Sequence, residues 1–455
     1  MSSPFLKIEG LDDFLLKFKS LRALDLSCTV IGQLPASIGN LKHLQYLSVN
    51  NTDIRRLPSE LCLLENLQTL EVRNCHQLVT LPEGTKNLAK LIYLDVRKQP
   101  GHVRMPIGVG ELIHLQSLPV LNVGEGLSDC SIQELRYLDN LHGDLAITGL
   151  ENIKVGTDAK EAKLIKKKHL ETLTLEWSDN SIYFEEEDED ISVEVFESLE
   201  PPRDLVNLIV RNYCSSLFPV WIEKSPFDNL QSITLDNCYN CYLLPALGDL
   251  QSLRYLCLRK MYALNFFGYN PSLPEKGSCG KFPALEILKL WEMYELEGWI
   301  GVKDGDFPRL HNVSICGCPT LKSLPRLPSL VDLSFYHCNQ LPEIPELRKL
   351  ESLKIECFQD MMSLDLPQGL PALKNRKAQL DVGTAAARCW RGGRGLPQAV
   401  WFVRDQATNR PTHTVVTVLH PTRLGLPPRR PSCPQSSLPS IRPVAGGFEQ
   451  PPHPR

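Results

Sequence analysis

A fixed spacing of aliphatic residues recurs along most of the chain. Each unit reads leucine, two residues, leucine or a similar residue, one residue, a third aliphatic residue, two residues, and then Asn, Cys or Thr in many units. Five units in the first part of the chain start 23 or 24 residues apart, at Leu21, Leu44, Leu67, Leu91 and Leu115. Eight more start at Leu170, Leu205, Leu230, Leu253, Leu285, Leu310, Leu330 and Leu350. Self-similarity at such a period indicates a repeat solenoid.

The spacing predicts one short strand in every unit. Side chains alternate across a strand, so the second and third aliphatic residues share one buried face and the residue between them points outward. About four or five buried aliphatic groups, worth roughly 1.5–3 kcal/mol each, do not offset a backbone entropy cost of about 1–2 kcal/mol per residue. Stability therefore requires stacking, and about thirteen units exceed the roughly three that suffice. We expect an α/β solenoid, a leucine-rich-repeat horseshoe whose strands form a concave parallel β-sheet.

The ninth position of each unit predicts a buried turn. Cys75, Cys238, Cys318 and Cys338 occupy it, and cysteine is a small hydrophobe with a weak S–H donor that suits such a turn. Cys238 and Cys241 have half of a zinc-ligand spacing, but no second ligand pair follows at a usable distance. We therefore expect no metal.

The positions of the prolines predict the backbone conformation on the convex side of the solenoid. Leu-Pro or Met-Pro pairs follow several turns, at Leu34-Pro35, Leu57-Pro58, Leu81-Pro82, Met105-Pro106, Leu244-Pro245 and Leu324-Pro325. Proline fixes φ and lacks an N–H group, so the convex side should be mostly irregular or 3₁₀ rather than long helix.

Two interruptions divide the repeats. Residues 1–137 and 199–374 carry the regular N-terminal and C-terminal repeats, and 138–180 form an irregular block in which Asp158 to His169 has a helical pattern. Residues 181–198 contain six consecutive acids, Glu185 to Asp190, which predict a solvated acidic loop. A docking site for a basic partner is the alternative interpretation of these acids.

The composition changes again in the C-terminal segment, residues 375–455. Leucine spacing stops, and proline, arginine and glycine become frequent, as in Pro427-Pro-Arg-Arg-Pro. A segment of this kind buries too little apolar surface to fold, so we predict a disordered tail. Contacts of its arginines with phosphates, or of its prolines with an aromatic groove, are alternatives.

Charge and targeting signals narrow the class of partner. The net charge is -4, which favours a protein partner over nucleic acid or an anionic membrane. We find no apolar run of membrane-spanning length and no secretory signal between Met1 and Leu16, so we expect a cytoplasmic protein without a membrane partner. Fifteen scattered cysteines, an odd number, fit reduced thiols.

Two stretches resemble one protein family. The first begins Leu21-Arg-Ala-Leu-Asp-Leu-Ser-Cys-Thr and is similar to the repeats of plant nucleotide-binding leucine-rich-repeat disease-resistance proteins of the coiled-coil class. The second runs from Leu138 to Trp177, includes Leu138-Asp-Asn-Leu-His-Gly-Asp-Leu and Asp158-Ala-Lys-Glu-Ala, and resembles a non-standard block found in that family, particularly in its cereal members. The resemblance covers roughly residues 11 to 373.

The resemblance implies a recognition role. In the family such repeats bind pathogen effectors or guarded host proteins and hold a nucleotide-binding switch off. The sequence contains no Gly-x-x-x-x-Gly-Lys-Ser/Thr phosphate loop, so the switch itself is not implied for this chain and we expect no cofactor. The expected partners are a pathogen effector, a guarded host protein or a receptor nucleotide-binding domain.

Outward strand positions give the candidate binding residues. Arginine and aromatic side chains dominate interface hot spots, and the candidates of these types are Arg73, Arg97, Arg211, Arg259, Trp291 and Tyr336. Three acids, Asp25, Glu71 and Asp95, are expected to supply complementary charge. The alternative is that these are ordinary solvated strand positions.

Other functional classes fit less well. Histidines such as His43 and His114 have no serine, cysteine and acid at motif spacing, so we expect no enzyme and no catalytic residues. An extracellular receptor would need a signal peptide and paired capping cysteines. A generic intracellular leucine-rich-repeat adaptor without an immune role remains the alternative function, and the block from Leu138 to Trp177 favours the immune one.

Overall fold

The computed structural model describes the repeats of the first of two compact units, Met1–Val418. The described residues are 6–7, 10–97, 103–126, 129–179, 186–224, 227–268, 281–338, 341–356, 403–404 and 411–412. The predicted tail therefore lies outside the described residues, apart from two short antiparallel strands, β19 (Val403–Arg404) and β20 (Pro411–Thr412).

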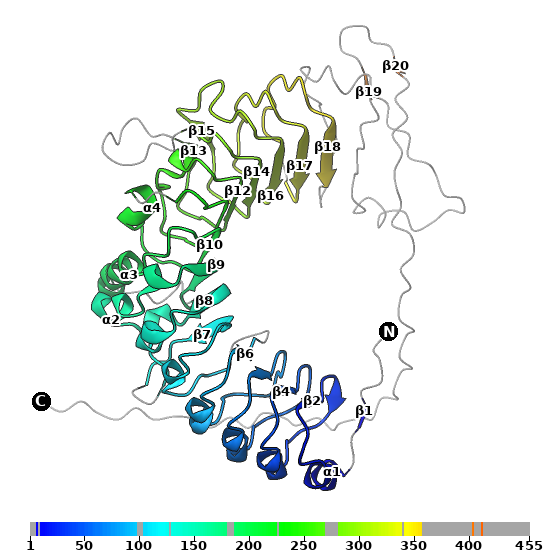
Figure 1. Ribbon diagram of the computed structural model, residues 1–455. Helices are drawn as coiled ribbons and strands as arrows, with labels where there is room; N and C mark the ends of the chain where they lie inside the picture. The colour runs from blue at the N-terminus through cyan, green and yellow to red at the C-terminus, as the bar shows by residue number, and fades with distance from the viewer. Residues whose placement is uncertain are drawn as a thin grey trace, which may run out of the picture. The chain divides into compact units, whose positions relative to one another are not determined.

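One parallel strand per repeat builds the main sheets. The ten-stranded sheet contains β7 (Val120–Asn122), β8 (His142–Thr148), β9 (His169–Glu176), β10 (Asn207–Arg211), β11 (Ser232–Asp236), β12 (Tyr255–Arg259), β14 (Ile287–Trp291), β16 (Asn312–Cys316), β17 (Asp332–Tyr336) and β18 (Ser352–Glu356). The four-stranded sheet contains β2 (Ala23–Asp25), β4 (Tyr46–Ser48), β5 (Thr69–Glu71) and β6 (Tyr93–Asp95). A bridge from Tyr93 to Ser117 continues the ladder between them. The strands line the concave side of a curved solenoid (Figure 1), as the spacing predicts.

Two smaller parallel pairs lie outside these sheets. They join β1 (Leu6–Lys7) to β3 (Thr29–Val30) and β13 (Phe266–Gly268) to β15 (Gly298–Ile300). The second pair contributes Phe267 and Trp299 to an aromatic cluster, and the ring centroids of these two residues lie 4.6 Å apart.

Short helical turns occupy the opposite side of the repeats. The 3₁₀ turns are η1 (Ala36–Asn40), η2 (Ser59–Leu63), η3 (Glu83–Asn87), η4 (Val109–Glu111), η5 (Ile132–Tyr137), η6 (Leu150–Asn152), η7 (Leu164–Lys166) and η8 (Leu247–Asp249). The α-helices are α1 (Leu11–Lys17), α2 (Gly156–Lys160), α3 (Glu186–Ser198) and α4 (Val220–Lys224). Prolines 35, 58 and 82 directly precede η1, η2 and η3 in extended conformation, which confirms the predicted 3₁₀ side.

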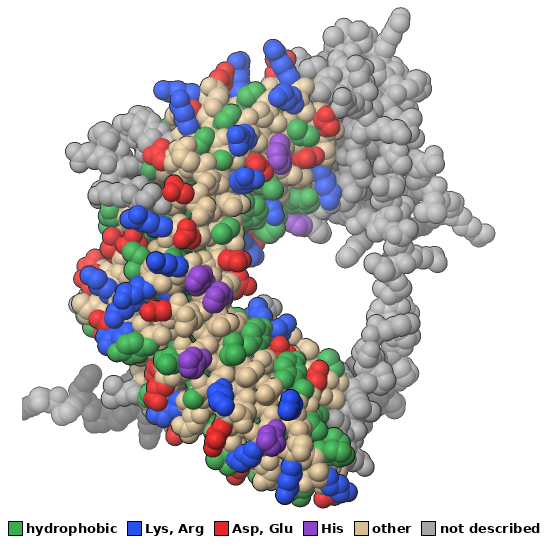
Figure 2. Space-filling model, viewed as in Figure 1, with side chains coloured by type: hydrophobic (Ala, Val, Ile, Leu, Met, Phe, Trp, Pro, Cys, Tyr) green, Lys and Arg blue, Asp and Glu red, His purple; other side chains and the backbone are tan. Residues whose placement is uncertain are grey.

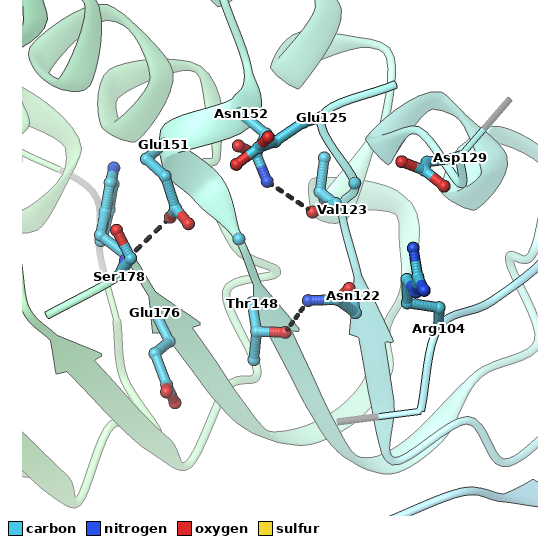
Figure 3. Close-up of a pocket in the computed structure, with 13 residues that line it drawn as sticks. Arg104, Asn122, Val123, Glu125, Asp129, Thr148, Glu151, Asn152, Glu176 and Ser178 are labelled. Carbon is cyan, nitrogen blue, oxygen red and sulfur yellow. Dashed lines mark hydrogen bonds between the residues drawn. The ribbon is translucent and has the colours of Figure 1, made fainter. Parts of the chain in front are cut away.

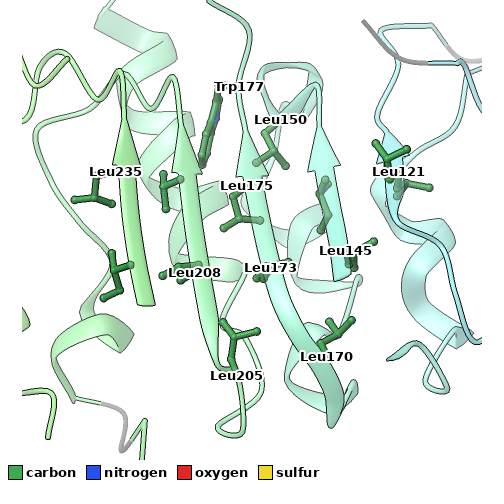
Figure 4. Packing of buried hydrophobic residues seen from close by; sticks show 14 of the residues in the cluster. Leu121, Leu145, Leu150, Leu170, Leu173, Leu175, Trp177, Leu205, Leu208 and Leu235 are labelled. Carbon is green, nitrogen blue, oxygen red and sulfur yellow. The ribbon is translucent and has the colours of Figure 1, made fainter. Parts of the chain in front are cut away.

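The core is a continuous stack of the repeat leucines. Leu173 and Leu175 of β9 are fully buried and lie between the equivalent residues of the flanking repeats, such as Leu208 (Figure 4). Trp177 closes this layer by packing against Phe196 and Tyr213. Each repeat thus buries its aliphatic residues against its neighbours.

The unit at Leu115 differs from its predicted register. The spacing made Val120 the third inward aliphatic residue and put Leu121 on the outward side. In the structure Leu121 is fully buried and pairs with Ile147 of β8, while Asn122 takes the outward position beside Thr148. The strand begins after Pro119, which has no N–H group to donate to the ladder, and the inward set moves by one residue.

The segment predicted as an acidic loop, residues 181–198, is largely a helix. Its residues 186–198 form α3, because Val195, Phe196 and Leu199 supply a buried apolar side that the acid count conceals. Glu189 also accepts hydrogen bonds from Ser215 and Ser216 of the neighbouring repeat. The loop predicted here is therefore a helix over residues 186–198.

The helix predicted over Asp158 to His169 is shorter than its pattern. It splits into α2 and the 3₁₀ turn η7, because Lys163 adopts a left-handed conformation with φ of 49° between them. Directly after η7, the side chain of Lys167 is fully buried. Its Nζ donates hydrogen bonds to the carbonyl oxygens of Leu135 at 2.7 Å and Leu138 at 3.2 Å. Burial lowers the pKa of Lys167 to about 8.

The turn after each strand uses one left-handed residue. In nine repeats the residue two positions after the third aliphatic residue of the unit has positive φ: Cys28, Asn51, Asn74, Asn212, Asn237, Lys260, Glu292, Gly317 and His337. In the eight repeats from Cys28 to Gly317 its N–H group donates to a carbonyl oxygen of the next repeat, as in Asn237 to Arg259 at 2.8 Å. The next residue is the predicted buried cysteine in four repeats, and Cys75 and Cys318 direct their Sγ to carbonyl oxygens of the preceding repeat.

We predict that inward and outward residues of one strand differ sharply in their effect on stability. Replacing Leu208, which is 1% exposed, with alanine should cost about 2–5 kcal/mol of unfolding free energy because a cavity forms. Ile209→Ala, at the adjacent outward position, should cost less than about 1 kcal/mol. Urea unfolding of both variants measures this, and equal costs would contradict the assigned register.

We also predict that the turn cysteines resist modification in the folded chain. Burial raises the pKa of Cys238 and of Cys318 to about 12, whereas Cys28 is exposed. Iodoacetamide labelling at neutral pH, followed by peptide mapping, should modify Cys28 and leave Cys238 and Cys318 unmodified until urea is added. Comparable labelling of all three in the folded chain would show that these turns are open.

Candidate protein-binding surface

The strand register places the predicted binding residues of the ten-stranded sheet in one row. This outward row runs across the strands through Glu176, Arg211, Asp236, Arg259, Trp291, Cys316 and Tyr336. Arg211, Arg259, Trp291 and Tyr336 are therefore brought to the same edge of the concave face. Trp291 is the direct neighbour of Arg259, and Tyr336 lies two strands beyond Trp291.

Carboxylates hold both arginines of this row. Arg211 Nη1 lies 3.2 Å from Glu176 Oε2. Arg259 Nη2 lies 2.9 Å from Glu292 Oε1, and its Nη1 lies 3.7 Å from Asp236 Oδ2. These arginines are about half-exposed and already ordered, which reduces the entropy that binding would cost.

A second group of predicted residues gathers on the four-stranded sheet around Asp95. Arg73 Nη2 lies 2.8 Å and Arg97 Nη2 lies 2.7 Å from Asp95 Oδ2, and Tyr93 Oη donates to the same oxygen at 3.3 Å. The Asp95 side chain is 0% exposed, whereas those of Arg73 and Arg97 are 40% and 44% exposed. One buried carboxylate thus fixes two guanidinium groups from successive repeats.

The role predicted for Asp95 needs correction. We expected it to offer its charge to a partner, but its side chain is fully buried and is already bound by Arg73, Arg97 and Tyr93. Burial alone would raise its carboxyl pKa, yet hydrogen bonds from Arg97 and the charges of Arg97 and Arg73 outweigh burial and lower the pKa below its usual value. Asp95 is a positioning residue for the arginines.

Glu71 and Asp25 lie in register with Asp95 on the same sheet. Glu71 Oε2 accepts hydrogen bonds from Asn50 at 2.7 Å and from Tyr46 and Ser48 at 3.2 Å each. Asp25 is exposed and accepts a hydrogen bond from the Ser27 N–H at 2.9 Å. Of the three predicted acids, Asp25 is therefore the most accessible to a partner.

Several contributors to this surface were not predicted. Tyr46, Tyr93 and Tyr255 occupy a further outward position, two residues before Ser48, Asp95 and Cys257 respectively, where the spacing rule placed no candidates. Lys289, which lies between two aromatic rings, was also missed because charge alone did not distinguish it from other outward residues. The signal that identifies them is register, which appears only once the strands are paired.

The structure also contains a cavity of about 360 Å³ at the ends of β7, β8 and β9 (Figure 3). Glu125, Asp129, Glu151 and Glu176 line it together with Arg104. Glu151 already accepts a hydrogen bond from the Ser178 N–H at 2.8 Å. Nowhere in the described ranges do three or more His, Cys, Asp or Glu side chains form a potential metal site.

The surface charge is mixed. On the face visible in Figure 2, basic and acidic side chains are interspersed over the described repeats. Among the described residues, no helix is both long and apolar enough to cross a membrane.

Comparison with known proteins identifies the relatives of these repeats. Residues 132–261 match the family model for R13L1/DRL21 leucine-rich repeats, which covers the block that suggested the resemblance. Over 344 residues the chain is 37% identical to the putative disease resistance protein RGA4 of Solanum bulbocastanum, covering 74% of this chain and 34% of RGA4. The homologues of this chain are thus plant disease-resistance proteins. The resemblance seen in the sequence is thereby confirmed.

The similarity to disease-resistance proteins concerns part of their length. The chain spans about a third of RGA4. It matches the putative disease resistance protein At3g14460 of Arabidopsis thaliana at 36% identity over 239 residues, 49% of this chain and 16% of that protein. A solved leucine-rich-repeat protein of Leptospira interrogans, LIC12759, is 20% identical with a TM-score of 0.44, covering 82% of this chain and 99% of its own.

We predict that Asp95 stabilises the concave face in a pH-dependent manner. Asp95→Asn should cost about 1–2 kcal/mol at neutral pH, a value reduced for the partial exposure of both arginines. Because the folded-state pKa is lowered, this stability is present above about pH 4 and is lost as pH falls through the folded pKa. Urea midpoints measured across this range should show the gap between wild type and Asp95→Asn closing in acid. Asp25→Asn is the exposed control, and a gap independent of pH would contradict the assignment.

Proposed function

We propose that this chain is the protein-recognition surface of a plant immune receptor and acts in the cytoplasm by binding, without a catalytic step. The observation that carries the proposal is a set of partly exposed arginines held by carboxylates, Arg73, Arg97 and Arg211, on a repeat array whose homologues are disease-resistance proteins. Such side chains contribute most of the energy in protein interfaces. The partner class we propose is a protein: a pathogen effector, a guarded host protein or a receptor nucleotide-binding domain.

The arrangement of the arginines supports binding over a purely structural role. A buried ion pair needs no exposed guanidinium, yet Arg73, Arg97 and Arg211 each keep about 40% or more of the side chain exposed while one part is held by a carboxylate. The exposed nitrogens retain donors in fixed positions, which favours bidentate contacts with acidic or carbonyl groups of a partner.

The test is affinity capture from infected and uninfected leaf tissue with three versions of the full chain. The versions are wild type, a variant carrying Arg73→Gln, Arg97→Gln and Arg211→Gln, and a control carrying Arg326→Gln and Arg348→Gln, whose side chains are 73% and 80% exposed away from the outward row. Glutamine avoids placing a carboxylate beside Asp95. We expect at least one protein that wild type and control retain and that the triple variant loses by tenfold or more.

The same versions separate an immune role from that of a general adaptor. Plants lacking the gene should support more pathogen growth, and wild type or control, but not the triple variant, should restore resistance. Capture that is unaffected by the triple variant would overturn the binding surface. Arginine-dependent capture together with unchanged pathogen growth would favour an adaptor without an immune role.

A further inference from the structure

A second cavity, of about 390 Å³, lies where β5 and β6 of the four-stranded sheet begin. Gln68 and Ile92, which directly precede these strands, line it together with Lys90 and with side chains of the next two repeats. The six lining residues are Gln68, Lys90, Ile92, His114, Gln116 and Asn140. They comprise one cation, one imidazole, three amides and one aliphatic side chain, so no carboxylate lines the cavity.

Backbone hydrogen bonds place the two glutamines on either side of Ile92. The Ile92 N–H donates to the Gln68 carbonyl oxygen at 2.8 Å, and the Gln116 N–H donates to the Ile92 carbonyl oxygen at 2.8 Å. Neighbouring strands are about 4.8 Å apart, so the two glutamines start from backbone positions roughly 10 Å apart. Among the described residues, no protein group forms a hydrogen bond with either glutamine side chain or with the His114 ring. Their N–H donors are therefore available to a ligand.

Hydrogen bonds to neutral groups hold Lys90 in this lining. Asn66 Nδ2 donates to the Lys42 carbonyl oxygen at 2.8 Å, which orients the Asn66 amide, and Lys90 Nζ donates to Asn66 Oδ1 at 2.7 Å. An ammonium group has three N–H donors, so two remain. No carboxylate in the part of the chain that the structure describes lies within ion-pair distance of Lys90. Its positive charge is thus positioned but not neutralised.

Acids that are close in sequence to the lining residues lie outside the lining. Glu111 Oε1 lies 3.1 Å from Lys86 Nζ, and Asp139 Oδ1 lies 3.7 Å from the Nζ of the buried Lys167. Glu65 is exposed and is not part of the lining. An anion in the cavity would therefore meet one cation and several neutral donors.

We propose that this cavity binds a phosphate monoester group. Such a group carries a charge of about −1.5 to −2 at neutral pH and has three strong acceptor oxygens. Lys90 supplies compensating charge, while Gln68, Gln116 and His114 supply neutral N–H donors, since histidine has an N–H group in either protonation state. A carboxylate, with one charge and two oxygens, would use fewer of these donors. The same phosphate chemistry occurs on phosphorylated protein side chains and in inorganic phosphate.

The cavity is separate from the arginines of the proposed binding surface. Gln68 precedes β5 and Arg73 follows it, and the five residues between these positions correspond to about 16 Å in an extended chain. The inference therefore goes beyond the proposed function, because it adds an anion site at the other end of the strands.

The test uses the full chain and a fluorescein-labelled glycine-serine peptide that carries one central phosphoserine. Matched peptides carry serine or glutamate at that position. Fluorescence anisotropy should show the phosphoserine peptide binding about tenfold more tightly than the serine peptide, and more tightly than the glutamate peptide, and added salt should weaken this binding. Equal affinity for the phosphoserine peptide and either matched peptide, or no binding by wild type, would overturn the inference.

Competition identifies the source of the phosphate group. If a protein side chain is the ligand, displacing the labelled peptide should need at least tenfold more inorganic phosphate than unlabelled phosphoserine peptide. Displacement at equal concentrations would still support a phosphate site, with inorganic phosphate as its ligand.

Single substitutions assign the binding to the cavity. Lys90→Gln should weaken binding of the phosphoserine peptide about tenfold, and Gln116→Glu, which places a carboxylate in the lining, should weaken it at least as much. Lys86→Gln, which removes an exposed lysine outside the lining, should leave binding unchanged. Equal urea midpoints would exclude misfolding. Wild-type affinity in Lys90→Gln would overturn the inference.

The arginine variant separates this inference from the proposed function. The chain carrying Arg73→Gln, Arg97→Gln and Arg211→Gln should bind the phosphoserine peptide as tightly as wild type. Loss of that binding would show that the arginines hold the phosphate and would overturn the assignment to the cavity. If the peptide test fails, the proposed function still stands provided that this variant loses its captured protein.

Discussion

The structure depends on burial that no repeat achieves alone. Each strand contributes two inward aliphatic residues, such as Leu173 and Leu175, whose shelter comes from the equivalent residues of the flanking strands. Because the inward residues alternate with outward ones, the packing of the core also fixes which side chains line the concave face. The proposed binding surface is therefore set by the same register that stabilises the fold.

Polar contacts on that face follow the same repeat order. Asp95 is buried beneath two arginines that come from its own repeat and the preceding one, and Arg259 is held by a glutamate of the following repeat. Except for that of Arg97, which lies two residues after Asp95, these contacts join side chains of adjacent repeats. They order long, flexible side chains in the unbound chain, which would lower the entropy cost of the proposed binding.

The architecture was predictable because leucine spacing encodes the period and the inward face directly. The horseshoe, the buried turn cysteines and the 3₁₀ side all follow from local chemistry at known positions. Leu121 was misplaced because spacing rules cannot register the effect of Pro119 on the start of a strand. Helix α3 was missed because six acids concealed the apolar side formed by Val195 and Phe196.

The outward residues were found from sequence, but their surroundings were not. Counting along a unit located Arg73, Arg97 and Asp95, yet the contact of Asp95 with Arg73 joins residues 22 positions apart, and Lys289 contacts the ring of Tyr255, 34 positions before it.

The left-handed turn residue has a consequence for how such chains diversify. Because its N–H group is satisfied by the next repeat and its conformation recurs in nine repeats, the junction between consecutive units is chemically the same wherever it occurs. Gain or loss of one complete unit by recombination would recreate an equivalent junction, while a shorter insertion would not. The concave surface can thus acquire a new combination of side chains in a single genetic event, at little cost to folding.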